Sequence, residues 1–142
     1  MSGEKDLLKL LENLSPSMSE DEYIFCTFED LTCGNFTDLE PFASVKEKEG
    51  LSLVLERKKA ERANIRFESI FRCISLGIHS DLTSIGLTAK ISSVLYENGI
   101  SSNIIAGYFH DHVLVPSYQA ENALEVLKKQ TLQFKQSRIT KK

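Results

Sequence analysis

The amino-acid sequence predicts an α+β protein made of two ferredoxin-like units, each with an antiparallel sheet and helices on one face. Two observations support this fold class. The second half reads as strand, helix, strand, strand, helix. The first half reads as strand, loop, strand, strand, short helix, which is the same motif without its crossover helix. A chain of 142 residues, 42% of them hydrophobic, can bury such a core.

The first half begins with leucines at helical spacing that stop at Ser15-Pro16. These leucines are Leu7, Leu8, Leu10, Leu11 and Leu14. A polar linker follows, and Tyr23 to Phe28 then predicts a strand because it is rich in aromatic and β-branched residues. The remaining predicted elements are a hairpin with strands at 42–48 and 51–55, its turn at Glu49-Gly50, and a short helix at 56–64.

The second half shows clearer periodicity. Ile70 to His79 predicts a strand, and Leu82 to Glu97 predicts a helix with its C-cap at Asn98-Gly99. The further predicted elements are a strand at 103–109, a turn at His110-Asp111, a strand at 112–115 and a closing helix after Pro116. The helical spacing predicts that the core includes Leu87, Ile91, Leu95, Leu124 and Leu127.

The number of strands raises a question about how the two units are completed. Two ferredoxin-like units need about eight strands, and six are visible in the sequence. Either Leu132 to Phe134 forms a short additional strand, or the units exchange strands, with the amino-terminal helix and first strand completing the second unit. We favour the intertwined arrangement. The expected division is 1–66 for the first unit, 67–134 for the second, and 135–142 for a flexible basic tail.

The composition argues against several classes of function. A net charge of −3 and a pI near 5.6 provide no positive field for nucleic acid. No apolar run approaches the roughly 20 residues of a membrane span, and no basic-then-apolar pattern typical of a signal peptide is seen at the start, so none is expected. Cys26, Cys33 and Cys73 form no C-x-x-C pair, so neither a disulfide framework nor a zinc cluster is expected. We expect a cytoplasmic protein that binds neither nucleic acid nor membranes.

Several segments resemble the ACT domain family. In His79 to Tyr108, the helix ends in Leu-x-Glu-x-Gly-Ile and is followed by Asn-Ile-Ile, as in ACT domains. Ala106 to Pro116, Glu22 to Thr27 and Lys48 to Glu56 are similar to small tandem-ACT proteins and to the paired ACT modules of aspartate kinases. The resemblance implies that ACT units associate edge to edge or face to face. It also implies that an amino acid or similar small molecule binds at the unit interface.

The loop from His79 to Gly86 is the candidate ligand site. It is expected to lead from a strand into the amino-terminal end of a helix, where free N–H groups and the helix dipole favour a carboxylate. Gly86 is expected in the first helical turn, and Asp81 either caps the helix or receives an amino group. Together with the resemblance, this predicts a ligand-binding set of His79, Ser80, Asp81, Leu82, Thr83, Gly86, Asn103, Ile104 and Ile105.

The three histidines are expected at one edge of the second unit. His79 would end beside His112, with His110 and Asp111 at the turn between the last two strands. Such a group could hold Zn²⁺ or do acid–base chemistry. An H-x-H pair in a hairpin has little specificity for a metal, however, and Asp111 forming the turn is the simpler interpretation. The sequence therefore predicts no metal site and no cofactor, with His79, His110 and His112 as alternative metal ligands.

No catalytic motif is recognisable, since G-x-S-x-G, P-loop, G-x-G-x-x-G and H-E-x-x-H patterns are all absent. We therefore expect no enzyme. The leading hypothesis is a regulatory module that binds a small, amino-acid-like ligand and acts as a homodimer. The alternatives are an interaction or structural module without a small ligand, and a metal-binding protein that uses the histidine edge.

Overall fold

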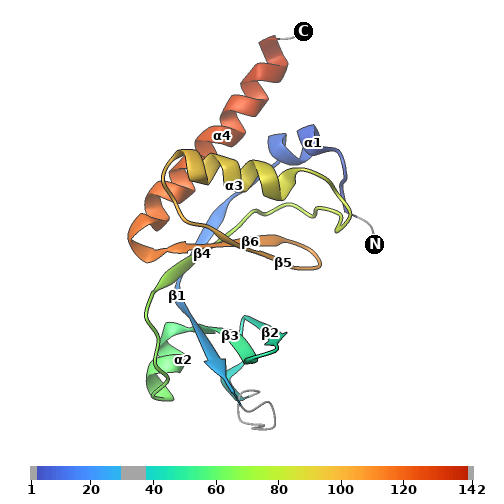
Figure 1. Ribbon diagram of the computed structural model, residues 1–142. Helices are drawn as coiled ribbons and strands as arrows, with labels where there is room; N and C mark the ends of the chain where they lie inside the picture. Colours follow the sequence, from blue (N-terminus) through green and yellow to red (C-terminus); the bar gives the residue numbers. More distant parts are fainter. Residues whose placement is uncertain (1–2, 30–37, 141–142) are drawn as a thin grey trace. The chain divides into compact units, whose positions relative to one another are not determined.

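The computed structural model describes residues 3–29 and 38–140 (Figure 1). Cys33, and the loop predicted around Gly34-Asn35, lie outside these residues. The elements in chain order are α1 (Leu7–Glu12), β1 (Ser17–Phe28), β2 (Ala43–Glu47), β3 (Gly50–Glu56), α2 (Arg57–Arg62), β4 (Phe71–Ser75), α3 (Leu87–Glu97), β5 (Asn103–Ala106), β6 (Asp111–Pro116), a 3-10 helix η2 (Ser117–Gln119) and α4 (Ala120–Thr140).

The chain forms two compact units that do not follow the order of the sequence. Unit 1 comprises Met1–Ser19 and Cys73–Lys142, and unit 2 comprises Glu20–Arg72. The amino-terminal helix α1 and the start of β1 therefore belong with the carboxy-terminal half of the chain. The sequence favours an exchange of this kind with the whole first strand, but only Ser17 to Ser19 of β1 join unit 1, and Tyr23 lies in unit 2.

The strand order explains how six strands complete two units. The order is β2-β3-β1-β4-β6-β5. Strands β2-β3-β1-β4 form one four-stranded set in ferredoxin-like order and β1-β4-β6-β5 form the other, so β1 and β4 serve in both. The 12 residues of β1 make this sharing feasible, because the strand begins in unit 1 and continues through unit 2. The α+β, ferredoxin-like prediction is confirmed.

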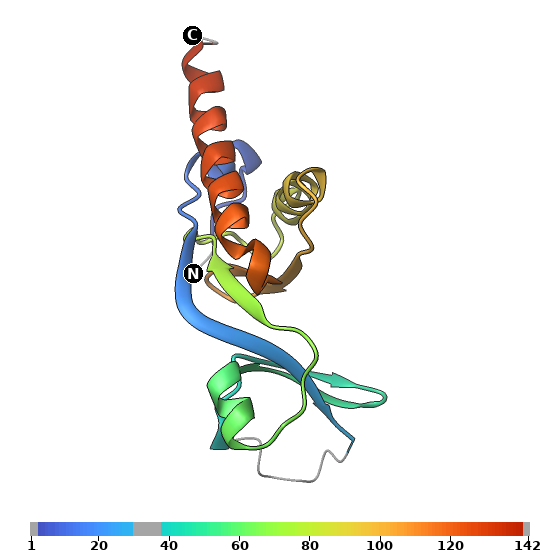
Figure 2. The ribbon, with the colours of Figure 1, turned by 90° about the vertical axis from the view of Figure 1, so that its left-hand side faces the viewer.

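Unit 1 buries its core between three helices and its strands. Helices α1, α3 and α4 contact one another, and α4 also contacts β6 (Figure 1, Figure 2). The buried cluster is Leu10, Leu11, Leu14, Ile74, Leu76, Leu87, Ile91, Leu95, Ile100, Val113, Val115, Ala120, Ala123 and Leu127. Four of the five predicted core residues are members, and the fifth, Leu124, packs against the cluster while partly buried.

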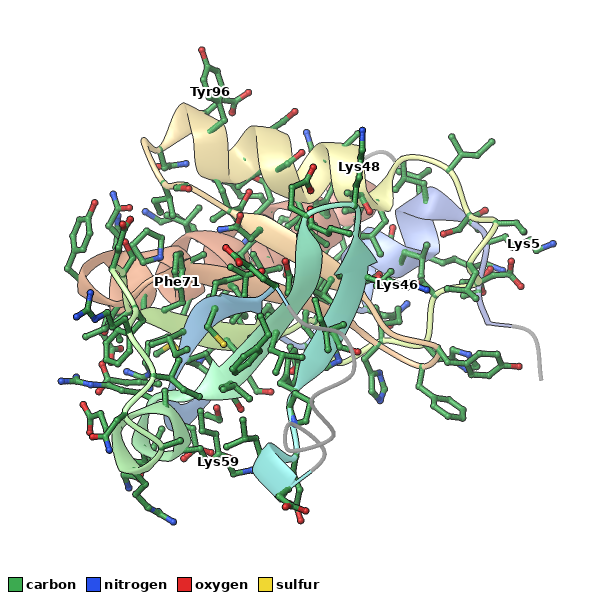
Figure 3. The ribbon with its side chains drawn as sticks, turned by 60° about the horizontal axis from the view of Figure 1, so that its bottom comes forward. Lys5, Lys46, Lys48, Lys59, Phe71 and Tyr96 are labelled. Atoms are coloured by element: carbon green, nitrogen blue, oxygen red, sulfur yellow. The ribbon has the colours of Figure 1, made fainter. Side chains whose placement is uncertain are left out.

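Unit 2 is built from a β-hairpin, part of β1 and one short helix. Strand β3 pairs antiparallel with β1 from Tyr23↔Glu56 to Phe28↔Leu51, and with β2 from Ala43↔Val54 to Glu47↔Gly50. The hairpin turn is therefore Lys48-Glu49, one residue earlier than predicted; Figure 3 labels Lys46 and Lys48 near it. The buried cluster of this unit is Ile24, Leu53, Leu55 and Ala60.

Two predicted boundaries around β1 and β4 are wrong. The expected polar linker before Tyr23 is strand from Ser17 onward, because β1 lies beside β4 in the sheet and strand pairing outweighs the polar composition. Strand β4 ends at Ser75 and not at His79, since Gly77 turns the backbone with φ +68°. The following helix begins at Leu87 and not at Leu82, so the segment between β4 and α3 is a longer loop than predicted.

The predictions for the last two strands also need correction. Strand β5 ends at Ala106, and residues Gly107 to His110 form the turn, closed by the Gly107 N–H donating to the His110 carbonyl (2.9 Å). Asp111 is not in the turn: it is the first residue of β6, paired with Ala106. Leu132 to Phe134 is not a strand, because it lies within α4, which continues to Thr140.

Candidate functional site

The loop between β4 and α3 is held by the amino-terminal segment of the same unit. Glu4 and Ser80 form an isolated parallel bridge. The Glu4 N–H donates to the His79 carbonyl (2.9 Å), and the Asp81 N–H donates to the Glu4 carbonyl (2.9 Å). The loop then turns back, because the Ser84 N–H donates to the Asp81 carbonyl (2.9 Å). The backbone of this loop is therefore held by the amino-terminal segment and by its own turn.

A hollow of about 350 Å³ lies at this loop. Its lining residues are Gly3, His79, Ser80, Asp81, Leu82, Thr83 and Tyr108. The structure thus brings together five of the nine predicted ligand residues, the consecutive run from His79 to Thr83. It does not place Gly86 or Asn103 to Ile105 in the lining: Gly86 is at the start of α3, and the other three residues belong to β5.

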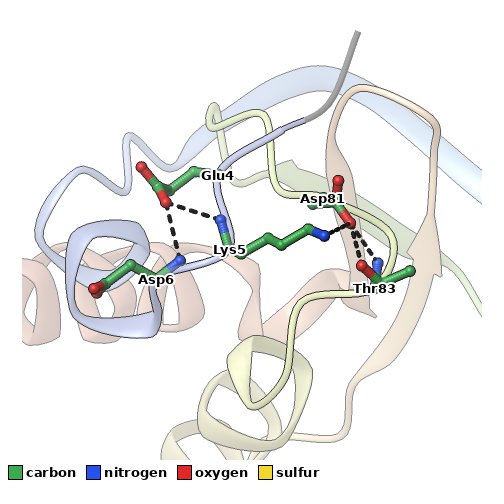
Figure 4. Close-up of polar contacts among 5 residues, drawn as sticks. All are labelled: Glu4, Lys5, Asp6, Asp81 and Thr83. Atoms are coloured by element: carbon green, nitrogen blue, oxygen red, sulfur yellow. Dashed lines mark hydrogen bonds and ion pairs between the residues drawn. The ribbon is translucent and has the colours of Figure 1, made fainter.

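Asp81 is the ionisable carboxylate in the lining of this hollow. Its Oδ1 accepts hydrogen bonds from the Thr83 backbone N–H (2.9 Å) and from the Thr83 hydroxyl, and the Lys5 Nζ lies 3.9 Å away (Figure 4). The hydrogen bonds from Thr83 hold the pKa of Asp81 below its ordinary value, with smaller contributions from the Lys5 charge and the Gly3 N–H. Asp81 is therefore an anion at neutral pH. It caps the Thr83 turn and not helix α3.

A buried hydrogen bond supports the loop from β6. The Ser80 hydroxyl donates to Asp111 Oδ2 (2.9 Å), and both residues are buried. A carboxylate taken out of water needs such a partner, because an unpaired one is costly. Asp111 therefore anchors the loop from within the unit, which replaces the turn-forming role that the sequence suggested.

The three histidines do not converge on a common point. The rings of His79 and Phe109 pack with their centroids 5.4 Å apart. His110 Nδ1 lies 3.4 Å from the Ile78 carbonyl oxygen. His112 Nδ1 shares a hydrogen bond with Ser75 Oγ (2.9 Å). Within residues 3–29 and 38–140, no group of three or more His, Cys, Asp or Glu residues could hold a metal ion. The histidine edge is therefore not favoured as a metal site.

His112 differs from an exposed histidine in its protonation. Burial lowers its pKa below the ordinary value, the neighbouring His110 lowers it further, and Asp111 opposes the change. The neutral imidazole is therefore favoured at this position.

Gly86 is the N-cap of α3 and adopts φ +103°, a backbone conformation that side chains rarely allow. A Cβ built there would lie 2.8 Å from Leu7 Cδ2. The expectation that Gly86 lies in the first helical turn is therefore wrong, since it precedes the helix as its N-cap. The glycine is needed for the backbone path and for the approach of Leu7.

Sequence reasoning missed two residues of the hollow. Tyr108 belongs to the β5–β6 turn. Its neighbours Phe109 and His110 were a usable signal, since exposed aromatic residues at a turn often contact a ligand or partner. Gly3 carries no local signal. It reaches the hollow only because the amino-terminal segment pairs with the loop.

The β4–α3 loop and the β5–β6 turn of unit 1 expose several large apolar side chains. Leu82 and Ile85 come from the β4–α3 loop and are 64% and 86% exposed; Tyr108 and Phe109 come from the β5–β6 turn and are 58% and 51% exposed. Phe109 and Tyr108 pack edge to face, with ring centroids 4.9 Å apart. We call these four residues the apolar rim. A single exposed apolar side chain needs no explanation, but a group of four does.

Comparison with known protein families gives the assignment. Models of the ACT domain match residues 2–72 and residues 68–129, in tandem. This chain belongs to the ACT domain family. The two matches overlap around β4, one of the two strands that both ACT sets use. The family expectation drawn from the sequence is confirmed.

Several solved structures share the fold of this tandem ACT protein. A protein of unknown function from Vibrio cholerae, described as a possible transport protein, is 41% identical, with a TM-score of 0.80, over 89% of this chain and 97% of that one. The ligand-free regulatory subunit of aspartate kinase from Thermus thermophilus shares the fold at 13% identity and a TM-score of 0.59, over 80% of this chain and 94% of that one.

A protein from Agrobacterium tumefaciens also shares the fold, at 16% identity and a TM-score of 0.63, over 83% of this chain and 89% of that one. The search of curated proteins found no match. No helix in the described part of this ACT protein is long and apolar enough to cross a membrane.

Proposed function

We propose that this protein is a regulatory ACT module that binds a small amino-acid-like ligand at the hollow formed by His79 to Thr83. The observation that carries the proposal is the hollow itself, which lies at the strand-to-helix loop singled out by the family resemblance. Asp81 supplies an anion for a ligand amino group. Leu82 and Tyr108 supply apolar surface for a side chain. The module is not an enzyme, and its output passes to a partner.

The ligand test is thermal unfolding with each of the twenty proteinogenic amino acids added singly. A ligand present at about 100 times its Kd should raise Tm by roughly 5–10 °C. Asp81→Asn removes the charge but keeps an oxygen that can accept from Thr83, so it should abolish the shift. Glu97→Gln, an exposed change on α3, is the matched control and should preserve it. If no amino acid shifts Tm, the amino-acid proposal fails and an interaction module without such a ligand becomes the better description.

We further propose that two copies associate through unit 1. The edge strand β5 carries no charged residue, no proline and no bulge, so nothing in its sequence protects it from pairing. The apolar rim lies in the same unit. In such a dimer, Asn103 to Ile105 would reach the hollow from the second copy, which is how the remaining predicted ligand residues could take part.

Sedimentation equilibrium at tens of micromolar tests the dimer, a concentration chosen for transient complexes. Wild type should sediment as a dimer, and Ile85→Lys should shift it toward monomer. Tyr96→Lys is the control, because Tyr96 is 81% exposed at the other end of α3, outside the apolar rim (Figure 3). A monomeric wild type would exclude this mode of action.

A further inference from the structure

The amino-terminal segment from Gly3 to Leu7 follows the ligand loop along most of its length. At one end, Gly3 lines the hollow beside His79 and Asp81. At the other end, the Leu7 side chain occupies the space beside Gly86. We call residues 3–7 the strap. It lies in unit 1 with the loop it contacts, so its contacts belong to a single compact unit.

The strap is joined to the loop by hydrogen bonds that use the backbone of both. Glu4 donates to His79 and accepts from Asp81, each at 2.9 Å. The Lys5 ammonium and the Gly3 N–H both act on the Asp81 carboxylate, which lowers its pKa. The strap is itself shaped locally, since Glu4 Oε1 accepts from the backbone N–H groups of Lys5 and Asp6 (Figure 4). Two of the five strap residues, Gly3 and Lys5, therefore act directly on the Asp81 carboxylate, which is the group proposed to bind the ligand amino group.

Gly3 is the point of closest approach. A Cβ at this residue would lie 2.6 Å from the Asp81 nitrogen, 2.6 Å from the Ser80 carbonyl carbon and 2.7 Å from the His79 carbonyl oxygen. These are backbone atoms, which cannot swing aside as the end of a side chain can. No positive φ accounts for glycine at this position. The glycine is needed because the strap backbone lies directly against the loop backbone.

We propose that the strap regulates the ligand site: it must be seated against the loop for the hollow to form, and ligand and strap stabilise one another. The proposal rests on the proposed function for the identity of the ligand, but the strap–loop coupling can be measured without any ligand. A ligand in the hollow contacts Gly3 and the loop together, so it favours the seated strap. By linkage, displacing the strap from the loop weakens ligand binding by the same factor.

The first experiment measures hydrogen exchange in the free protein. Gly3→Val should unseat the strap and speed exchange of the Asp81 amide and its loop by at least about tenfold, while amides of β3 in unit 2 stay unchanged. Gly99→Ala is the matched control: it also replaces a glycine in unit 1 and strains the backbone at φ +70°, but a Cβ there meets nothing within 4 Å. It therefore reports a general loss of stability without touching the strap, and local exchange of the loop should stay as in wild type. Glu4→Pro, which removes the N–H that donates to His79, should reproduce the effect of Gly3→Val.

Unchanged hydrogen exchange of the loop amides in both Gly3→Val and Glu4→Pro would overturn the proposal that the strap holds the loop. Faster exchange throughout unit 1, equal for Gly3→Val and Gly99→Ala, would also overturn it, since the effect would then be a general loss of stability.

The second experiment repeats the thermal shift with the twenty amino acids on Gly3→Val and Gly99→Ala. An amino acid that stabilises wild type and Gly99→Ala, but stabilises Gly3→Val at least about tenfold more weakly in Kd, supports the coupling. Equal affinity for all three proteins would overturn it. If no amino acid stabilises wild type, the proposed ligand fails, and hydrogen exchange alone decides whether the strap orders the loop.

Discussion

The two units follow one ferredoxin-like plan, yet they bury their apolar side chains very differently. The described core cluster of unit 1 has fourteen buried residues drawn from three helices and its strands, whereas that of unit 2 has four, served by the six-residue helix α2. The candidate site lies in the unit with the larger cluster. The strands give both units the same topology. The helices determine how firmly a loop can be held, and functional loops need such a rigid support.

The largest effects should come from truncating the two cores. Leu95 in unit 1 and Leu55 in unit 2 are both fully buried. Each change to alanine should cost about 2–5 kcal/mol of unfolding free energy, and Leu95→Ala should cost more because its neighbours form the more extensive cluster. Urea unfolding measures both. If Leu55→Ala lost as much unfolding free energy as Leu95→Ala, the expected difference between the two cores would be contradicted.

A smaller effect is expected at the junction of the ligand loop and α3. Gly86→Val forces a β-branched residue into φ +103° and against Leu7, which should cost about 1–3 kcal/mol. Gly99→Ala, at φ +70° with open space around it, should cost about 1 kcal/mol. Thermal unfolding in parallel separates steric clash from backbone strain. Equal losses would show that Leu7 moves aside freely and that unit 1 is less rigid here than its core suggests.

Unit 1 should also contribute a pH dependence near neutrality through His112. The pKa of His112 is lowered in the folded state, so the unfolded state binds more protons as pH falls below about 6.5. The stabilising contribution of neutral His112 is thus complete above that pH and is lost as pH falls toward the folded-state value. His112→Gln should flatten the Tm profile between about pH 7 and pH 5. A steeper profile in the variant would reverse the sign of this argument.

The smallest effect concerns thiol reactivity in the two units. Burial raises the pKa of Cys73 in unit 1 to about 11, and raises the pKa of the half-buried Cys26 in unit 2 by less. Because the thiolate is the reactive form, Cys26 should be alkylated by iodoacetamide faster than Cys73 at about pH 8. Peptide mass spectrometry follows each site. Faster reaction at Cys73 would indicate that unit 1 opens more readily than unit 2.

Much of the fold was readable from local pattern. The leucine spacing from Leu87 to Leu95 identified α3 and its buried face, and Asn98-Gly99 identified its end, because helical period and capping are properties of a short segment. The His79 to Thr83 run was predicted from a polar loop leading into a helix together with the family resemblance. The order of elements and the family likeness together were enough to predict a tandem ferredoxin-like protein.

Tertiary contacts decided what no local pattern contains. The polar start of β1 becomes strand because it pairs with neighbouring strands, and β1 and β4 each serve both four-stranded sets. Asp111 moves from an expected turn to a buried bond with Ser80, and Gly3 joins the hollow from 76 residues before His79 in the chain. Each of these positions depends on atoms that are distant in sequence, and the free energy of burying or pairing them outweighs local preference.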